Sequence, residues 1–140
     1  MTEYIIRKLY ENDYTEYLEL INNLRTTIFS KEDFLKILNA IKDNSDIWVI
    51  EKDKKLIACG TILYEHKFIH NICKLGHIED VCVSNLYRNQ NYGKILMNHL
   101  VKECLKNNCY KVSLYCDEKL EYFYKRVGFE KKNIEMNIYF

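Results

Sequence analysis

The sequence predicts a mixed α/β fold, in which a mostly antiparallel central sheet carries helices on both faces. Strand-like and helix-like runs follow one another in the order β-α-α-β-β-β-α-β-α-β. Three strands in succession favour antiparallel pairing, and the two later strand–helix units favour some parallel pairing. The length of 140 residues suits one domain, 1–140, and the 48% hydrophobic residues are enough for a core.

Hydrophobic spacing and turn residues define the individual elements. In chain order we expect a strand at 4–9, a helix at 12–24, a helix beginning at Ser30, a hairpin of strands 46–51 and 56–66, a strand at 77–83, a helix at 93–108, a strand at 110–116, a helix at 118–128 and a strand at 134–140. The strand at 4–9, YIIRKL, is a short apolar run, and the helix at 12–24 has apolar residues at helical spacing. Ser30 can cap the second helix, with Asp33 as its capping-box partner. The polar turn KDKK at 52–55 joins the hairpin strands.

The second half of the chain has stronger signals. The strand at 77–83 is apolar on nearly every residue after Asp80, which is typical of a strand buried on both faces. The helix at 93–108 has an apolar stripe with two flanking residues, namely Leu96, Leu100 and Cys104, with Val101 and Leu105 beside them. The strand at 110–116, YKVSLYC, follows that helix as part of a strand–helix unit. Gly128 suits the left-handed position that ends a helix, and the segment 134–140 alternates as a strand does.

Charge and composition exclude several classes of protein. The net charge is +1, with 21 basic and 20 acidic residues, so we expect neither nucleic acid nor a membrane surface as the main partner. No apolar run is long enough to span a bilayer, and the start, MTEYIIRKLYEND, lacks a secretion signal, which favours a cytoplasmic location. None of the six cysteines forms a C-x-x-C pair, so we expect reduced and mostly buried thiols. The histidines fit no metal-ligand spacing, and we expect no metal.

The loop RNQNYG at 88–93 lies between a buried strand and a strong helix. A helix N-terminus exposes unpaired N–H groups that bind anions when the preceding backbone can approach closely. Glycine usually provides that backbone shape, but asparagine also adopts the left-handed conformation, so Asn89 and Asn91 can replace it. Arg88 and Lys94 add positive charge. Taken by itself the loop fits a phosphate site and an ordinary asparagine-rich turn equally well.

The surrounding motifs distinguish these alternatives. The strand IEDVCV, this loop, the helix after it and the later FYKRVGF together resemble the GNAT superfamily of N-acetyltransferases. The loop signature of that superfamily is Arg/Gln-x-x-Gly-x-Gly/Ala, and Arg88, Asn91 and Gly93 occupy its fixed places, with Asn91 where glycine is usual. The segments EHKFIH, GHIEDVCV, NCYKVSL, CDEK and EMNI are similar to the glucosamine-6-phosphate N-acetyltransferase branch, over roughly residues 17–138.

The resemblance implies an acetyl-CoA site. In such enzymes backbone amides of the loop hold the pyrophosphate, and the preceding strand pairs with the pantetheine arm. The implied residues are Val81, Cys82, Val83, Arg88, Asn89, Gln90, Asn91, Tyr92, Gly93 and Lys94. An amide near Cys82 would polarise the thioester carbonyl. Tyr124 matches the tyrosine that faces the sulfur of CoA and protonates the leaving thiolate. Without the resemblance, Tyr124 would read as a core residue beside Tyr122 and Phe123.

Two carboxylates are implied in the chemistry. Glu79 and Asp80 are adjacent, so in a regular strand they point to opposite faces, unless a bulge intervenes. One would then bond backbone groups while the other is solvated. The resemblance implies that both touch the amino sugar, and Glu79, acting through a water, is our candidate for removing the amine proton.

The resemblance is weaker at the acceptor site than at the acetyl-CoA site. The resemblance implies that Lys67, Phe68, Ile69 and His70 contact the sugar phosphate, with Val81 and Thr26 bordering the site. Lys67 and His70 would otherwise read as surface residues. Two positions depart from the family: Tyr115 stands where an acid contacts the amine, and Tyr139 stands where an arginine reaches the phosphate across a homodimer. Both still offer a hydroxyl.

The sequence therefore predicts acetyl transfer from acetyl-CoA to glucosamine 6-phosphate by direct attack, on the route to UDP-N-acetylglucosamine. A first alternative is a GNAT enzyme that acetylates a polyamine, a peptide N-terminus or a lysine, since none of these needs Lys67 or His70. A second alternative is a CoA-binding module without catalysis.

Overall fold

The computed structural model describes residues 3–140, and its centre is a twisted sheet of five strands. The strands are β1 (Ile5–Lys8), β2 (Ser45–Lys52), β3 (Lys55–Lys67), β4 (Cys73–Val83) and β5 (Lys111–Leu114). They lie in the order β1-β2-β3-β4-β5. The first four pair antiparallel, and only β5 runs parallel to its neighbour β4. This confirms the predicted mixed and mostly antiparallel sheet.

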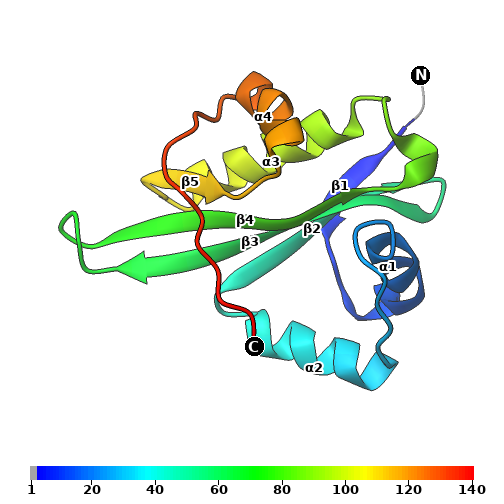
Figure 1. Ribbon diagram of the computed structural model, residues 1–140. Coiled ribbons are helices and arrows are strands. Elements are labelled where there is room, and N and C mark those ends of the chain that lie inside the picture. Colours follow the sequence, from blue (N-terminus) through cyan, green and yellow to red (C-terminus); the bar gives the residue numbers. More distant parts are fainter. Residues whose placement is uncertain (1–2) are drawn as a thin grey trace.

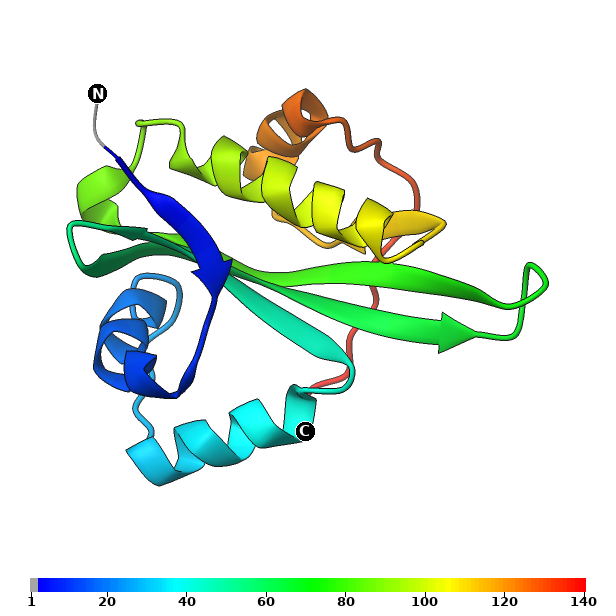
Figure 2. The ribbon, with the colours of Figure 1, turned by 180° about the vertical axis from the view of Figure 1, so that it is seen from behind.

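Helices cover both faces of the sheet, as predicted (Figure 1). One face carries α1 (Tyr14–Ile21) and α2 (Lys31–Ile41), and the other carries α3 (Tyr92–Lys106) and α4 (Glu121–Val127). Short 3₁₀ turns precede α1 at Glu11–Asp13, the loop before α3 at Asn85–Tyr87, and α4 at Glu118–Leu120. Figure 2 shows α3 lying along the sheet from the side opposite to α1 and α2.

Each face has its own core. The α3-side core includes Ile50, Ile62, Ile78, Leu96 and Leu100. The α1-side core includes Leu20, Phe34, Val49, Cys59 and Cys82. The predicted stripe of α3 is confirmed, since Leu96, Leu100 and Cys104 are fully buried, but Leu105 is 74% exposed because it turns away from the sheet. Burial of this apolar surface on both faces of β2, β3 and β4 is the main source of stability.

Local sequence signals set the helix ends. The hydroxyl of Ser30 accepts a hydrogen bond of 3.1 Å from the backbone N–H of Asp33 and begins α2, as predicted. Gly128 ends α4 with φ 119°, a backbone conformation that a residue with a Cβ rarely adopts. Both signals act within a few residues, which is why they can be recognised in the sequence.

An ion-pair network fixes β1 to the turn that follows it. The guanidinium of Arg7 donates to both carboxylate oxygens of Asp13, at 2.8 and 2.9 Å, and to Glu51 at 2.8 Å. Asp13 is only 5% exposed. A buried carboxylate needs such a bidentate partner, since an unpaired charge there would be costly.

The predicted strand at 134–140 is wrong. No strand is assigned after β5, and the segment crosses the sheet as irregular chain and ends near the C-terminal end of α2 (Figure 1). Its large apolar side chains are all at least 82% exposed, namely Ile134, Met136, Ile138, Tyr139 and Phe140. Alternation of apolar residues produces a strand only where a free sheet edge accepts it, and this segment pairs with no edge of its own chain.

Candidate functional site

A β-bulge lies at the centre of the candidate site. Cys59 is opposite Cys82 and Thr61 is opposite Glu79, so Gly60 alone faces both Asp80 and Val81. Asp80 takes the left-handed conformation, with φ 49°. A Cβ on Gly60 would lie 2.8 Å from Cδ1 of Leu100, so glycine lets the bulge approach α3.

The bulge changes which face each side chain occupies. Ile78 and Val81 both pack into the α3-side core, although residues three apart in a regular strand point to opposite faces. Glu79 and Asp80 are both exposed. Burial raises the pKa of Tyr17 in α1, and the negative charge of Asp80 raises it further. The alternative left open by the sequence, a bulge that interrupts the alternation, is therefore the one observed.

The surroundings of Glu79 change its acidity. Burial raises the pKa of Glu79, and Asp80 raises it further. His77 acts in the opposite direction, and Glu135 of the C-terminal segment raises the pKa again. Glu79 is thereby a better proton acceptor than an ordinary surface carboxylate, which is what a general base requires.

The strands β4 and β5 separate next to the bulge. Their last paired residues are Ile78 and Leu114, and β4 continues to Val83. Within residues 3–140, positions 79–83 of β4 pair with β3 on one side and with no strand on the β5 side. The side chains of Val81, Cys82 and Val83 lie in the two cores. With no strand on the β5 side, the backbone N–H and C=O groups of this edge are what a ligand can bind.

The loop at 88–93 has the predicted backbone shape. Asn89 and Asn91 have φ angles of 62° and 74°, in the left-handed region, and Asn91 is the N-cap residue of α3. Arg88 is exposed and bends back so that its Nε lies 3.4 Å from the carbonyl of Val83. Gln90 is exposed as well, and its amide donates to the carbonyl of Leu86 at 3.4 Å. The first N–H groups of α3, from Tyr92 to Lys94, begin the helix beside this loop, where an anion is favoured.

Side-chain roles within the loop differ. Tyr92 is buried and packs edge-on against Tyr4 and Tyr87, with ring centroids 5.8 and 6.1 Å apart, so only its backbone faces the loop. A Cβ on Gly93 would lie 3.3 Å from Cζ of Phe123. Glycine at this position therefore lets Phe123 of α4 pack closely on the start of α3.

Tyr124 is half-buried and packs against the same core as Val81 and Val83. Its ring lies edge-on to Phe123 and Phe129, at centroid distances of 4.9 and 6.1 Å. Burial raises the pKa of Tyr124, and Cys116 raises it further. The phenol therefore stays protonated at neutral pH and can donate its proton.

Two polar residues that the sequence interpretation missed, Glu65 and His77, lie beside the predicted Lys67. Glu65 bonds Nε2 of His77 at 2.9 Å and Nζ of Lys67 at 3.1 Å. The hydrogen bond from His77 lowers the pKa of Glu65, and that from Lys67 lowers it further. Strand alternation puts these residues on the face of Glu79, because Leu63 is opposite His77 and Thr61 is opposite Glu79. The spacing of two residues between Glu65 and Lys67, and between His77 and Glu79, is the sequence signal that could have placed these side chains on one face.

The predicted segment 67–70 divides between a strand and a turn. Lys67 is the last residue of β3 rather than part of a loop, because β3 and β4 pair up to Lys67 and Cys73. Phe68 and Ile69 are exposed at the tip of the hairpin, at 92% and 56%. His70 has φ 52°, and its ring lies 5.0 Å from that of Tyr110.

The remaining predicted acceptor residues lie at the surface. Thr26 is exposed in the loop between α1 and α2. Tyr115 follows β5 directly and is 60% exposed, and Tyr139 in the C-terminal segment is 89% exposed. Within one chain, these three side chains are available to a ligand or to another subunit, and none belongs to the core.

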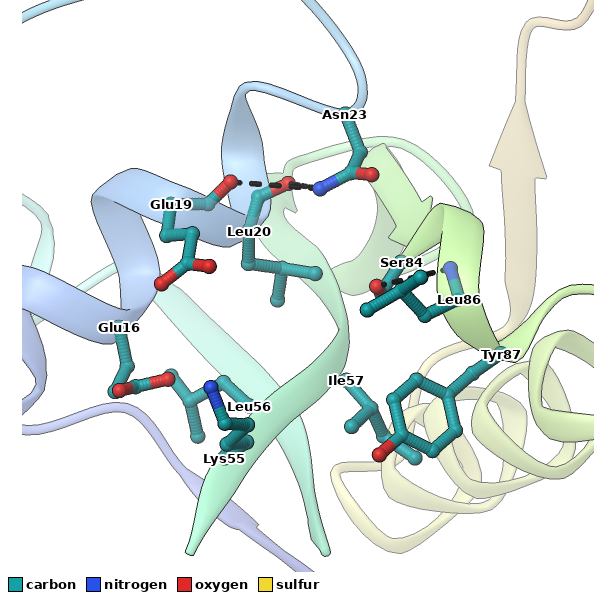
Figure 3. A pocket seen from close by; sticks show the side chains of 10 residues that line it. All are labelled: Glu16, Glu19, Leu20, Asn23, Lys55, Leu56, Ile57, Ser84, Leu86 and Tyr87. Atoms are coloured by element: carbon teal, nitrogen blue, oxygen red, sulfur yellow. Dashed lines mark hydrogen bonds between the residues drawn. The ribbon is translucent and has the colours of Figure 1, made fainter.

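A pocket elsewhere is separate from these residues (Figure 3). It lies between α1, the start of β3 and the turn that precedes α3, and its lining includes Glu16, Lys55 and Tyr87. None of the predicted site residues lines it. Over the described residues, 3–140, no group of three or more His, Cys, Asp or Glu side chains could hold a metal ion. In the same part of the chain, every helix is too short or too polar to cross a membrane.

Comparison with known proteins gives consistent matches. The model of the acetyltransferase (GNAT) family matches residues 5–129. Glucosamine 6-phosphate N-acetyltransferase 1 of Dictyostelium discoideum is 39% identical over 128 residues, which cover 88% of this chain and 82% of that protein. The Arabidopsis thaliana glucosamine 6-phosphate N-acetyltransferase is 36% identical over 142 residues, covering 96% and 95%. The crystal structure of glucosamine-6-phosphate N-acetyltransferase from Arabidopsis thaliana superposes with a TM-score of 0.93 at 35% identity, over 99% of each chain.

Proposed function

This chain belongs to the acetyltransferase (GNAT) family, and we propose that it transfers the acetyl group of acetyl-CoA to the amine of glucosamine 6-phosphate. The observation that carries the proposal is the free edge of β4 at 79–83, which is followed in the chain by the left-handed asparagine loop and packs against the same core as Tyr124. The similarity to two glucosamine 6-phosphate N-acetyltransferases, over most of each chain, supports the choice of acceptor. We take residues 1–140 as a single catalytic domain.

The donor would bind along the free edge of β4. Backbone groups of Val81, Cys82 and Val83 would pair with the amide-containing pantetheine arm, as an added strand does. The loop Asn89–Gln90–Asn91, followed by the first amides of α3, would hold the pyrophosphate, with Arg88 and Lys94 supplying positive charge. The left-handed asparagines make this arrangement possible without the usual glycine.

Acetyl transfer would proceed by direct attack. Glu79, whose pKa is raised, would accept a proton from the acceptor ammonium through a water. The amine nitrogen would then form a bond with the thioester carbon while a backbone N–H near Cys82 stabilises the carbonyl oxygen. When the C–S bond breaks, Tyr124 would donate its phenolic proton to the sulfur. No covalent intermediate on the protein is required.

The acceptor would lie on the face that carries the bulge. Glu79 and Asp80 would bind the amine and hydroxyls, and Lys67, His70 and the hairpin tip would approach the phosphate. Lys67 is already paired with Glu65, so its charge is held in place on this face. The product would enter UDP-N-acetylglucosamine synthesis in the cytoplasm.

We also propose a homodimer. The C-terminal segment exposes five large apolar side chains, namely Ile134, Met136, Ile138, Tyr139 and Phe140. A second copy would cover these side chains and bring Tyr139 to the acceptor site of the partner subunit. Light scattering after gel filtration tests this proposal: the full chain should be dimeric, and a chain ending at residue 133 should be monomeric.

The test of function is an acetylation assay read by mass spectrometry, which avoids interference from the thiols. The protein is incubated with acetyl-CoA and, separately, with glucosamine 6-phosphate, glucosamine and spermine. We expect rapid formation of the phosphosugar product only. Turnover with another amine alone would mean that Tyr115 and Tyr139 have changed the acceptor, and binding of acetyl-CoA without any turnover would indicate a non-catalytic module.

A further inference from the structure

Two cysteines lie directly opposite each other beneath α1. Cys59 of β3 and Cys82 of β4 are cross-strand partners, and they are the pair next to the bulge. Their exposed fractions are 1% and 4%, and both belong to the α1-side core. The mechanism proposed above uses only the backbone near Cys82, so these two thiols have no assigned role.

The spacing of opposite residues suits a disulfide. Cα atoms that face each other across an antiparallel pair are about 4.5–5.5 Å apart, within the range of about 4.4–6.8 Å found across disulfides. The Cβ atoms of such a pair are about 4.5–5.5 Å apart, whereas a disulfide needs about 3.5–4.5 Å. The bond can therefore form if β3 and β4 close by about 1 Å at this position.

The two thiols also differ chemically, as the members of a reactive pair should. The neighbouring thiol of Cys59 lowers the pKa of Cys82, burial opposes this effect, and the positive charge of Arg88 lowers the pKa further. The neighbouring Cys82 and burial raise the pKa of Cys59. Cys82 is thus the better nucleophile, and Cys59 remains a protonated partner close by.

We propose that Cys59 and Cys82 form a redox-active dithiol whose reversible oxidation to a disulfide lowers acetyl transfer. With hydrogen peroxide as the oxidant, the thiolate of Cys82 attacks one peroxide oxygen, the O–O bond breaks, and a sulfenic acid and hydroxide form. The hydroxide takes up the proton that the Cys82 thiol released and becomes the first water. The sulfur of Cys59 then attacks the sulfenic sulfur, and a second water leaves. Two thiols and one peroxide give one disulfide and two waters. A thiol reductant such as dithiothreitol reverses the change.

The disulfide would disturb the site through the bulge. At present Cys59 Sγ donates to the carbonyl of Asp80, at 3.9 Å, and Cys82 Sγ donates to the carbonyl of Leu20, at 3.4 Å. Oxidation removes both hydrogen bonds and moves the backbone that carries Asp80 and the free edge of β4. Displacement of catalytic geometry by about 1 Å can cost roughly 100-fold in rate. A bond formed under such strain is also easier to reduce.

The test is peptide mapping of the peroxide-treated wild-type protein, with free thiols blocked by N-ethylmaleimide and no reductant. We expect a peptide pair linked through Cys59 and Cys82, together with a loss of about tenfold to 100-fold in kcat/KM that dithiothreitol restores. Cys59→Ser should prevent both the link and the loss. Cys104→Ser, which alters the other close pair of thiols, Cys104 and Cys109, should prevent neither.

Several results would overturn the proposal. They are oxidation of the exposed Cys116 without the Cys59–Cys82 link, a link that leaves kcat/KM unchanged, or equal loss of activity in Cys59→Ser. Cys59→Ala is the second variant if the serine does not fold. The loss of kcat/KM rests on the proposed acetyl transfer, but the linked peptide is detected without any activity. Absence of the link and absence of turnover are therefore separate failures.

Discussion

Replacement of Tyr124 by phenylalanine tests the proposed proton donor. The substitution removes one hydroxyl and keeps the ring that packs at 4.9 Å from Phe123 and 6.1 Å from Phe129. Positioned proton donors contribute about 10²–10⁴-fold to rate, which corresponds to roughly 2.7–5.5 kcal/mol at about 1.36 kcal/mol per factor of ten. We expect kcat to fall within this range while the thermal midpoint and acetyl-CoA affinity change little.

The control lies on the same helix. Tyr122→Phe removes a hydroxyl from a side chain that is 73% exposed and should leave kcat unchanged. Because the pKa of Tyr124 is raised by burial, the phenol keeps its proton well above neutral pH, so the wild-type kcat should show no alkaline decline below about pH 10. An unchanged kcat in Tyr124→Phe, with acetyl-CoA saturating, would refute the proton-donor role.

Three further predictions concern pH and stability. The pKa of Glu79 is raised in the folded state, so the folded protein binds a proton more tightly than the unfolded chain and its stability falls as pH rises above the ordinary pKa of 4.5. Glu79→Gln should lack this fall in urea titrations from pH 4 to 8, and it should lose acetyl transfer. Parallel stability curves for the two proteins would contradict this reasoning. Arg7→Ala leaves the buried carboxylate of Asp13 unpaired and should cost about 3 kcal/mol of unfolding free energy, with a smaller loss in the double variant that also carries Asp13→Asn. Gly76→Ala would place a Cβ 2.6 Å from Sγ of Cys104 and should lower the free energy of unfolding by about 1–3 kcal/mol. Adding Cys104→Ala should recover part of this loss. If the losses of the two single variants simply added in the double variant, the two sites would not be in contact.

The predicted elements were accurate where the signal was local. Apolar spacing, the Ser30 cap and the Gly128 terminator act within one or two helical turns, and each predicted helix and the first five strands are observed. The prediction of a strand at 134–140 was wrong because a strand needs a neighbouring sheet edge, and the sequence contains no information on whether the same chain supplies one. Hairpin length was underestimated for a similar reason, since β4 begins at Cys73 rather than at residue 77 and its first residues pair with β3 as far as Lys67.

In the candidate site, too, the features set by local sequence were predicted and those set by strand pairing were not. The left-handed conformation of Asn89 and Asn91 followed from the residue type alone, because asparagine tolerates positive φ. The placement of Glu79 and Asp80 did not, since it depends on a bulge opposite Gly60 that only the pairing of β3 with β4 creates.

The sequence by itself determined the order of elements, the polar and apolar faces and the loop that begins α3, because these depend on residues close together in the chain. Only the tertiary structure decided that β4 and β5 separate after Ile78, that Glu65 bonds His77, and that Cys59 faces Cys82. Each of these contacts joins residues distant in sequence, and its register is set by packing of the whole sheet between two helical layers.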